Sequence, residues 1–155
     1  MEYKELIDSL AKKNYAPVYL LTGEEPYFID KASNYIEDHF FENETDKDFN
    51  FQLLYGKDVT VNQIVAFSKE YPMMSDYRLV IVREAQDMDG KEKDYDYLAG
   101  YVKNPQKKTV LVICHKDKKL NAKTAFYKVV AKHGIVFNSA RVYDNQLPEH
   151  IKNIV

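Results

Sequence analysis

The sequence predicts an α/β fold, in which a largely parallel β-sheet is covered by helices. Two observations carry this prediction. Short, nearly uninterrupted runs of Val, Ile and Leu are typical of strands buried on both faces, and apolar residues between these runs recur every three or four positions, as in helices. Strands that alternate with helices form layered α/β domains. The five predicted strands are 17–23, 49–56, 78–84, 109–115 and 134–140.

Helical segments are predicted between these strands. The last of them, 122–133, has Asn121 before it as an N-cap and Gly134 after it as a C-cap. The charged, turn-rich segment 85–97 is expected to be an exposed connection into a helix near 97–103. The three other predicted helices cover 28–40, 61–68 and 122–133.

Length and composition indicate one globular core. The chain has 155 residues, of which 45% are hydrophobic, enough to bury a sizeable core. A single cysteine excludes an internal disulfide framework, and the four histidines show no metal-binding spacing with it. The charged N-terminal segment lacks the apolar core of a signal peptide, and no later stretch has the ~20 apolar residues of a membrane span. We therefore expect a soluble, cytoplasmic protein without a membrane partner.

The C-terminal residues suggest a domain boundary. Pro148 stands where a new helix would begin, close to the end of the chain. We expect an N-terminal domain over 1–141 and, over 142–155, the truncated start of a second, helical domain.

Charge is distributed unevenly along the chain. Residues 1–99 hold 11 Lys and Arg against 21 Asp and Glu, whereas residues 100–141 hold 10 against one. The basic part either faces DNA or an acidic partner, or forms ordinary solvated helix faces. Lys116, Lys118 and Lys119 follow a predicted strand, where open α/β sheets tend to bind ligands.

The stretch "VYLLTGEEPYFIDKA" (18–32) has the strand, glycine turn and helix of a phosphate-binding loop without its chemistry. Such a loop needs a lysine for the terminal phosphates and a Ser or Thr for magnesium, but Gly23 is followed by two glutamates and Pro26. Glu24 and Glu25 suit a helix N-terminus, and Pro26 suits the first helical position. We expect a structural loop; a nucleotide-binding ATPase with an unconventional loop is the alternative.

Other candidate chemistry is weak. The strand 78–84 ends in Arg83 and Glu84, where a magnesium-binding motif would place an aspartate. Cys114 lies in an apolar run, as a small buried hydrophobe does. The sequence predicts no catalytic residue, no cofactor site and no metal site. The acidic residues considered for a metal and judged to be a solvated loop are Asp87, Asp89, Glu92, Asp94 and Asp96.

The stretch "YPMMSDY" places two methionines in a turn. Pro72 ends the preceding helical pattern, so Met73 and Met74 are not expected on a regular core face. Methionine is flexible and polarizable, which suits an adaptable contact surface. The alternative is that one or both side chains tuck under the sheet.

Four stretches together resemble the N-terminal region of the bacterial DNA polymerase III delta subunit, a clamp-loader component. The resemblance implies an AAA+/P-loop-like three-layer domain with a five-stranded parallel sheet in the order 5-1-4-3-2, followed by helical domains. The stretches are "VYLLTGEEPYFIDKA", "YPMMSDYRLVIVREA", "KKTVLVICHKDKKLNAKTAFYKVV" and "VYDNQLPEHIKNIV".

The resemblance also implies a function in DNA replication. Delta subunits bind the sliding clamp (the beta subunit) and help to open the ring for loading onto primed DNA, while other clamp-loader subunits hydrolyse ATP. DNA contact is implied only through the assembled complex. The clamp-binding segment of the family matches Pro72, Met73, Met74 and Ser75 here, with two methionines where leucine and phenylalanine are often found.

Overall fold

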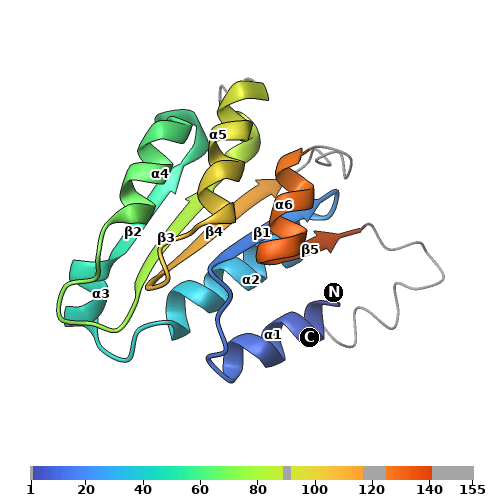
Figure 1. The fold of residues 1–155 in the computed structure, drawn as a ribbon. Coiled ribbons are helices and arrows are strands. Elements are labelled where there is room, and N and C mark those ends of the chain that lie inside the picture. The colour runs from blue at the N-terminus through green and yellow to red at the C-terminus, as the bar shows by residue number, and fades with distance from the viewer. Residues whose placement is uncertain (1, 89–91, 117–124, 141–155) are drawn as a thin grey trace.

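Five parallel strands form one sheet in the computed structural model, which describes residues 2–88, 92–116 and 125–140. The strand order is β2-β3-β4-β1-β5 (Figure 1), which confirms the predicted order 5-1-4-3-2. Each strand lies inside its predicted range or extends one residue beyond it. The strands are β1 (Val18–Gly23), β2 (Phe51–Tyr55), β3 (Arg78–Arg83), β4 (Thr109–Lys116) and β5 (Ile135–Ser139).

Helices cover both faces of this sheet, which gives the three predicted layers (Figure 1). α4, α5 and α6 pack on one face, where Val18 and Leu20 of β1 point. α1 and α2 pack on the other, against Tyr19 and Leu21. The helices are α1 (Tyr3–Ala11), α2 (Pro26–His39), α3 (Glu44–Asn50), α4 (Val61–Lys69), α5 (Glu92–Lys103) and α6 (Ala125–His133), with short 3-10 turns η1 (Gly56–Asp58) and η2 (Ala85–Asp87).

Two predicted boundaries are wrong. α5 begins at Glu92 rather than near 97, and Ala85 and Met88 of the expected exposed connection are buried. The strand predicted from residue 49 begins at Phe51, because α3 precedes it and continues through Asn50. α3 is capped by the Asn43 side chain, which accepts a hydrogen bond from the Asp46 amide at 2.8 Å.

Gly134 ends α6 as predicted, but the need for glycine has another cause. Its amide donates to the Val130 carbonyl at 2.7 Å, and its φ is outside the left-handed region that a typical glycine cap adopts. A Cβ at this position would overlap the carbonyl oxygen of Val18. Close approach to β1 therefore requires the glycine. The predicted N-cap Asn121 and the predicted second domain 142–155 lie outside the described residues.

No helix within the described ranges has the length and apolar character needed to cross a bilayer.

Candidate functional site

The predicted clamp-binding residues lie in the loop between α4 and β3, residues 70–77, which we call the methionine loop. This loop is at the edge of the sheet where the parallel strands begin (Figure 1). The Met73 side chain is 59% exposed and that of Met74 is 95% exposed, so neither tucks under the sheet. Met74 has a left-handed φ of 56°, uncommon for a residue other than glycine. The turn presents both methionines to solvent.

A buried amide holds this turn in place. Asn50, at the end of α3, has no exposed surface, and its Oδ1 accepts a hydrogen bond from the Met73 amide at 2.5 Å. Its Nδ2 donates to the Met73 carbonyl at 2.8 Å and to the Asp46 carbonyl at 3.0 Å. Because the side-chain amide satisfies both backbone groups of Met73, the methionine is fixed to α3.

Arg78 fixes the two ends of the methionine loop. Its buried side chain donates from Nε to the Phe67 carbonyl at 3.1 Å and pairs with Glu70 at 3.0 Å. Ser75 Oγ donates to the Tyr77 carbonyl at 3.2 Å within the loop. Pro72 is half-buried. Of the four predicted residues, Pro72 and Ser75 therefore shape the loop, and the two methionines form its exposed surface.

Aromatic side chains extend this surface. Tyr71 and Tyr77 of the methionine loop and Phe49 of α3 are exposed as well. Sequence reasoning missed Phe49, because the apolar run 49–56 reads as one strand, and only the α3 boundary places it outside the sheet. Exposed large hydrophobic side chains gathered at one edge are a feature of interaction surfaces.

The turn between β1 and α2, which has the outline of a phosphate-binding loop, lies at the opposite edge of the sheet, where the strands end. β1 ends at Gly23, whose φ is +127°, and α2 begins at Pro26. Glu25 is the N-cap, and its carboxylate accepts a hydrogen bond from the Tyr27 amide at 3.2 Å. The predicted turn geometry is confirmed: Gly23 has positive φ, Pro26 begins the helix, and a carboxylate of the chain itself caps the helix N-terminus.

An ion-pair network lies next to the positions at which a phosphate-binding loop would hold its lysine and hydroxyl residue. The spacing of a phosphate loop that starts at Gly23 puts Ile29 in the place of the lysine and Asp30 in the place of the hydroxyl residue. Ile29 is fully buried. Asp30 pairs with Lys116 at 2.5 Å, and Lys116 pairs with Glu84 at 2.9 Å.

Gln86 completes this network. Its amide nitrogen donates to Glu84 at 2.6 Å, and its amide oxygen accepts from the backbone of Lys116 at 2.8 Å. The hydrogen bonds from Lys116 and Gln86 lower the pKa of Glu84 below its ordinary value. Burial lowers the pKa of Lys116, but its hydrogen bonds to Asp30 and Glu84 outweigh burial and raise it overall. The lowered pKa of Glu84 and the raised pKa of Lys116 both favour the charged forms of this ion pair.

This network corrects one expectation. The sequence predicts that Lys116, like Lys118 and Lys119, is available to an anionic ligand, but its side chain is only 13% exposed and is paired with two carboxylates. The two other lysines lie outside the described residues. Cys114, two residues before Lys116 on β4 and paired with Leu21 of β1, is fully buried, and burial raises the pKa of its thiol to about 11. It is a packing residue rather than a nucleophile.

Comparison with known proteins identifies the family and agrees with the fold. The family described as "DNA polymerase III, delta subunit" matches residues 19–140. The chain belongs to this family. The delta subunit of Bacillus subtilis (strain 168) DNA polymerase III is 26% identical over 152 residues, which is 94% of this chain and 44% of that protein. The chain therefore spans less than half of this relative.

Solved structures show the same architecture. A Bacillus subtilis DNA clamp loader delta protein superposes with a TM-score of 0.82 at 24% identity, over 99% of this chain and 47% of that one. A Thermotoga maritima DNA polymerase III gamma subunit-related protein superposes with a TM-score of 0.55 at 14% identity, over 98% and 50%. The predicted membership in the delta family and the predicted AAA+-type α/β fold are both confirmed.

Proposed function

We propose that this delta-family chain binds the sliding clamp of its own organism through Met73 and Met74 and helps to open the ring for loading onto primed DNA. The observation that carries the proposal is the methionine turn, in which Asn50 fixes the backbone of Met73 while both methionine side chains stay exposed. A preorganised apolar plug loses little conformational freedom when it enters a pocket.

The energetics support Met73 and Met74 as anchors. Burying one methionine side chain in a partner pocket contributes roughly 1.5–3 kcal/mol before ordering costs. Two adjacent anchors are enough to make the turn a binding hot spot. Their exposure has no benefit for folding, because neither packs into the two apolar cores of the domain.

Ring opening requires more than affinity. A binding partner shifts an equilibrium only by the difference between its affinities for the two states, so the methionine loop must bind the opened clamp interface more tightly than the closed one. The rigid attachment of this loop to α3 and β3 allows it to hold one preferred orientation against the clamp.

In this proposal the domain does not hydrolyse ATP, and other clamp-loader subunits supply the ATP cycle. The ion pairs of Lys116 with Asp30 and Glu84 support this part, because they occupy groups that a nucleotide site would need free. DNA is contacted through the assembled complex.

Calorimetric titration of the 155-residue chain with the clamp tests the proposal. Micromolar or tighter binding is expected for the wild type, and a Met73→Ala/Met74→Ala variant with an unchanged melting temperature should lose at least about tenfold in affinity. Tyr97→Ala, which removes an exposed aromatic side chain from α5, is the matched control and should bind as the wild type does. Equal binding by all three proteins would refute the role of the methionines.

A further inference from the structure

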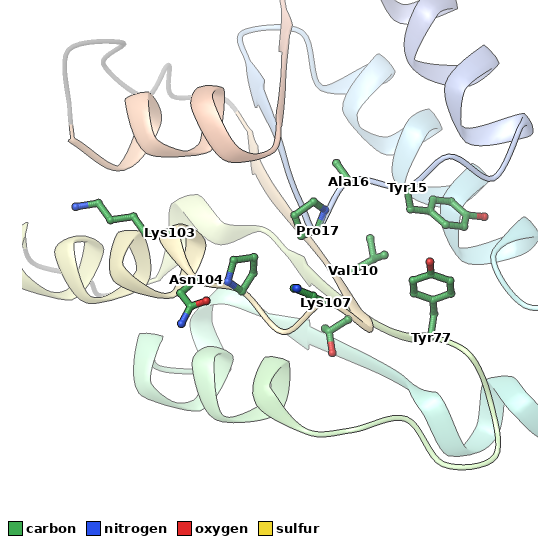
Figure 2. Close-up of a pocket in the computed structure, with 10 residues that line it drawn as sticks. Tyr15, Ala16, Pro17, Tyr77, Lys103, Asn104, Lys107 and Val110 are labelled. Atoms are coloured by element: carbon green, nitrogen blue, oxygen red, sulfur yellow. The ribbon is translucent and has the colours of Figure 1, made fainter.

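Two hollows adjoin the methionine loop at the same edge of the sheet. One, of about 370 Å³, lies between Tyr15 and Pro17, which precede β1, and Tyr77 of the methionine loop (Figure 2). The other, of about 390 Å³, is lined by Tyr71 of that loop and by Lys108. Both hollows are also lined by Asn104, Pro105 and Lys107, so the segment that follows α5 separates them.

Hydrogen bonds fix this segment to the methionine loop. The Arg78 amide donates to the Lys108 carbonyl at 2.8 Å, and Thr109 Oγ1 donates to the Glu70 carbonyl at 3.4 Å. The buried hydroxyl of Tyr101 donates to the Ser68 carbonyl at 3.2 Å and accepts from the Gln106 amide at 3.3 Å. The two loops therefore form one structural unit rather than two independent surface segments.

Four lysines of this unit carry positive charge, and we call them the basic ridge. They are Lys69, Lys103, Lys107 and Lys108. All four lysines are exposed and line one or both hollows. None of their ammonium groups has a carboxylate partner within the part of the chain that the structure describes. The nearby Glu70 is already paired with Arg78. Basic side chains around hollows that tyrosine and proline line suit a ligand that is both acidic and partly apolar.

We propose that the basic ridge binds an acidic, partly apolar segment of the same sliding clamp that receives Met73 and Met74. This inference rests on the proposed function. Tyr77 is three residues from Met74, so their Cα atoms are at most about 11 Å apart. A partner surface that encloses Met74 is therefore within reach of the hollow that Tyr77 lines. Tyr71, which is two residues from Met73, lines the second hollow.

The same observations favour an acidic protein segment over nucleic acid. Tyr15 and Tyr77 meet edge to face, with ring centroids 6.2 Å apart, so they do not form an open platform for stacked bases. The ridge holds lysines and no arginine, the residue that nucleic-acid surfaces favour. The exposed methionines beside the ridge also require a partner with an apolar pocket.

The test is clamp titration with a Lys103→Gln/Lys107→Gln variant. The matched control is Lys128→Gln/Lys132→Gln, which removes the same charge from two exposed positions on α6. At about 50 mM salt the ridge variant should bind the clamp about five- to tenfold more weakly than the control, and at about 300 mM salt the difference should shrink because the charges are screened. The control should match the wild type.

Each other outcome has a definite meaning. Equal clamp binding by the ridge variant and the control overturns the inference while leaving the proposed function intact. Unchanged clamp binding with loss of binding to a duplex DNA probe would make the ridge a nucleic-acid surface, which also overturns it. A wild-type chain that fails to bind the clamp refutes the proposed function itself, and this inference with it.

Discussion

Asn50 and Met73, 23 residues apart in sequence, are joined by two hydrogen bonds in opposite directions. The side-chain oxygen of Asn50 accepts from the Met73 amide at 2.5 Å, and its nitrogen donates to the Met73 carbonyl at 2.8 Å. The amide thus pairs with the loop as a neighbouring strand would. It links the end of α3 to the one turn that exposes two methionines.

Replacing this amide should loosen the methionine loop. Asn50→Ala leaves the amide and carbonyl of Met73 without their partners, and the free energy of unfolding should fall by about 2 kcal/mol. Binding of the clamp should weaken as well, because the methionines would then have to be ordered on binding. Chemical denaturation and calorimetric titration measure the two effects.

Asn43→Ala is the matched control for this prediction. It removes the N-cap of α3 and should lower the free energy of unfolding by about 1 kcal/mol, yet it leaves both bonds to Met73 in place. Its clamp affinity should equal that of the wild type. If both asparagine variants weaken clamp binding alike, general destabilisation rather than release of the loop would explain the Asn50 result.

Gly23→Ala should be strongly destabilising, although the position binds nothing in the proposal. Gly23 has a φ of +127°, and a Cβ there would overlap the carbonyl oxygen of Ser139. A strained backbone conformation costs about 1–3 kcal/mol, and the overlap adds to this. Gly100→Ala is the opposite case, because nothing lies within 4 Å of its Cβ position in α5, and it should stabilise by about 0.5–1 kcal/mol. If Gly23→Ala melts at the same temperature as Gly100→Ala or higher, the close contact of β1 and β5 at Gly23 is contradicted.

Much of this fold was predictable because its local signals agree with its global arrangement. β1, β3 and β4 are buried on both faces and therefore appear as apolar runs, and α2 and α4 have helical period. The order of the sheet came from the family resemblance, since periodicity alone does not specify which strands are neighbours. α3 was missed because its residues are mostly polar and its cap, Asn43, precedes no apolar pattern.

The candidate site was predictable only in part. Pro72 marks a turn, so the position of Met73 and Met74 in a loop follows from the sequence, whereas their exposure depends on Asn50, a contact across 23 residues. Lys116 shows the same limit. Its place at the end of a strand suggests a lysine that is free to bind an anion. In the structure its ammonium group forms ion pairs with Asp30 and Glu84, which come from two distant segments. Pairings of this kind are set by tertiary structure.

Magnesium-ATP should leave the melting temperature unchanged. A nucleotide present at 100 times its dissociation constant would stabilise the chain by about 2.7 kcal/mol, a shift that thermal unfolding detects easily. No such shift is expected, since Ile29 and Asp30 stand where the lysine and hydroxyl residue of a phosphate loop would be. Magnesium chloride without ATP controls for general salt effects. A shift that requires both components would revive the alternative of an unconventional nucleotide-binding protein.

The last prediction concerns the pH dependence that Lys116 imposes on stability. Lys116→Met removes the ion pairs with Asp30 and Glu84, and at neutral pH the free energy of unfolding should fall by about 1 kcal/mol, a modest loss because both carboxylates are partly exposed. Because Lys116 lowers the pKa of Glu84, the folded protein binds this proton less readily than the unfolded chain, whose ordinary value is 4.5. The contribution is therefore complete well above pH 4.5 and is lost as the pH falls through the lowered pKa.

Urea unfolding of both proteins at a series of pH values measures this effect. The difference between wild type and Lys116→Met should be largest from about pH 6 to pH 9 and should shrink towards about pH 3. It should persist on the alkaline side, because the raised pKa of Lys116 keeps the ammonium charged up to and beyond its ordinary value of 10.5. Glu84→Gln is the matched control, since it removes the titrating group and should flatten the acid limb while Lys116 still pairs with Asp30. If the difference in the free energy of unfolding does not change with pH, Lys116 stabilises the fold by packing and not through its charge.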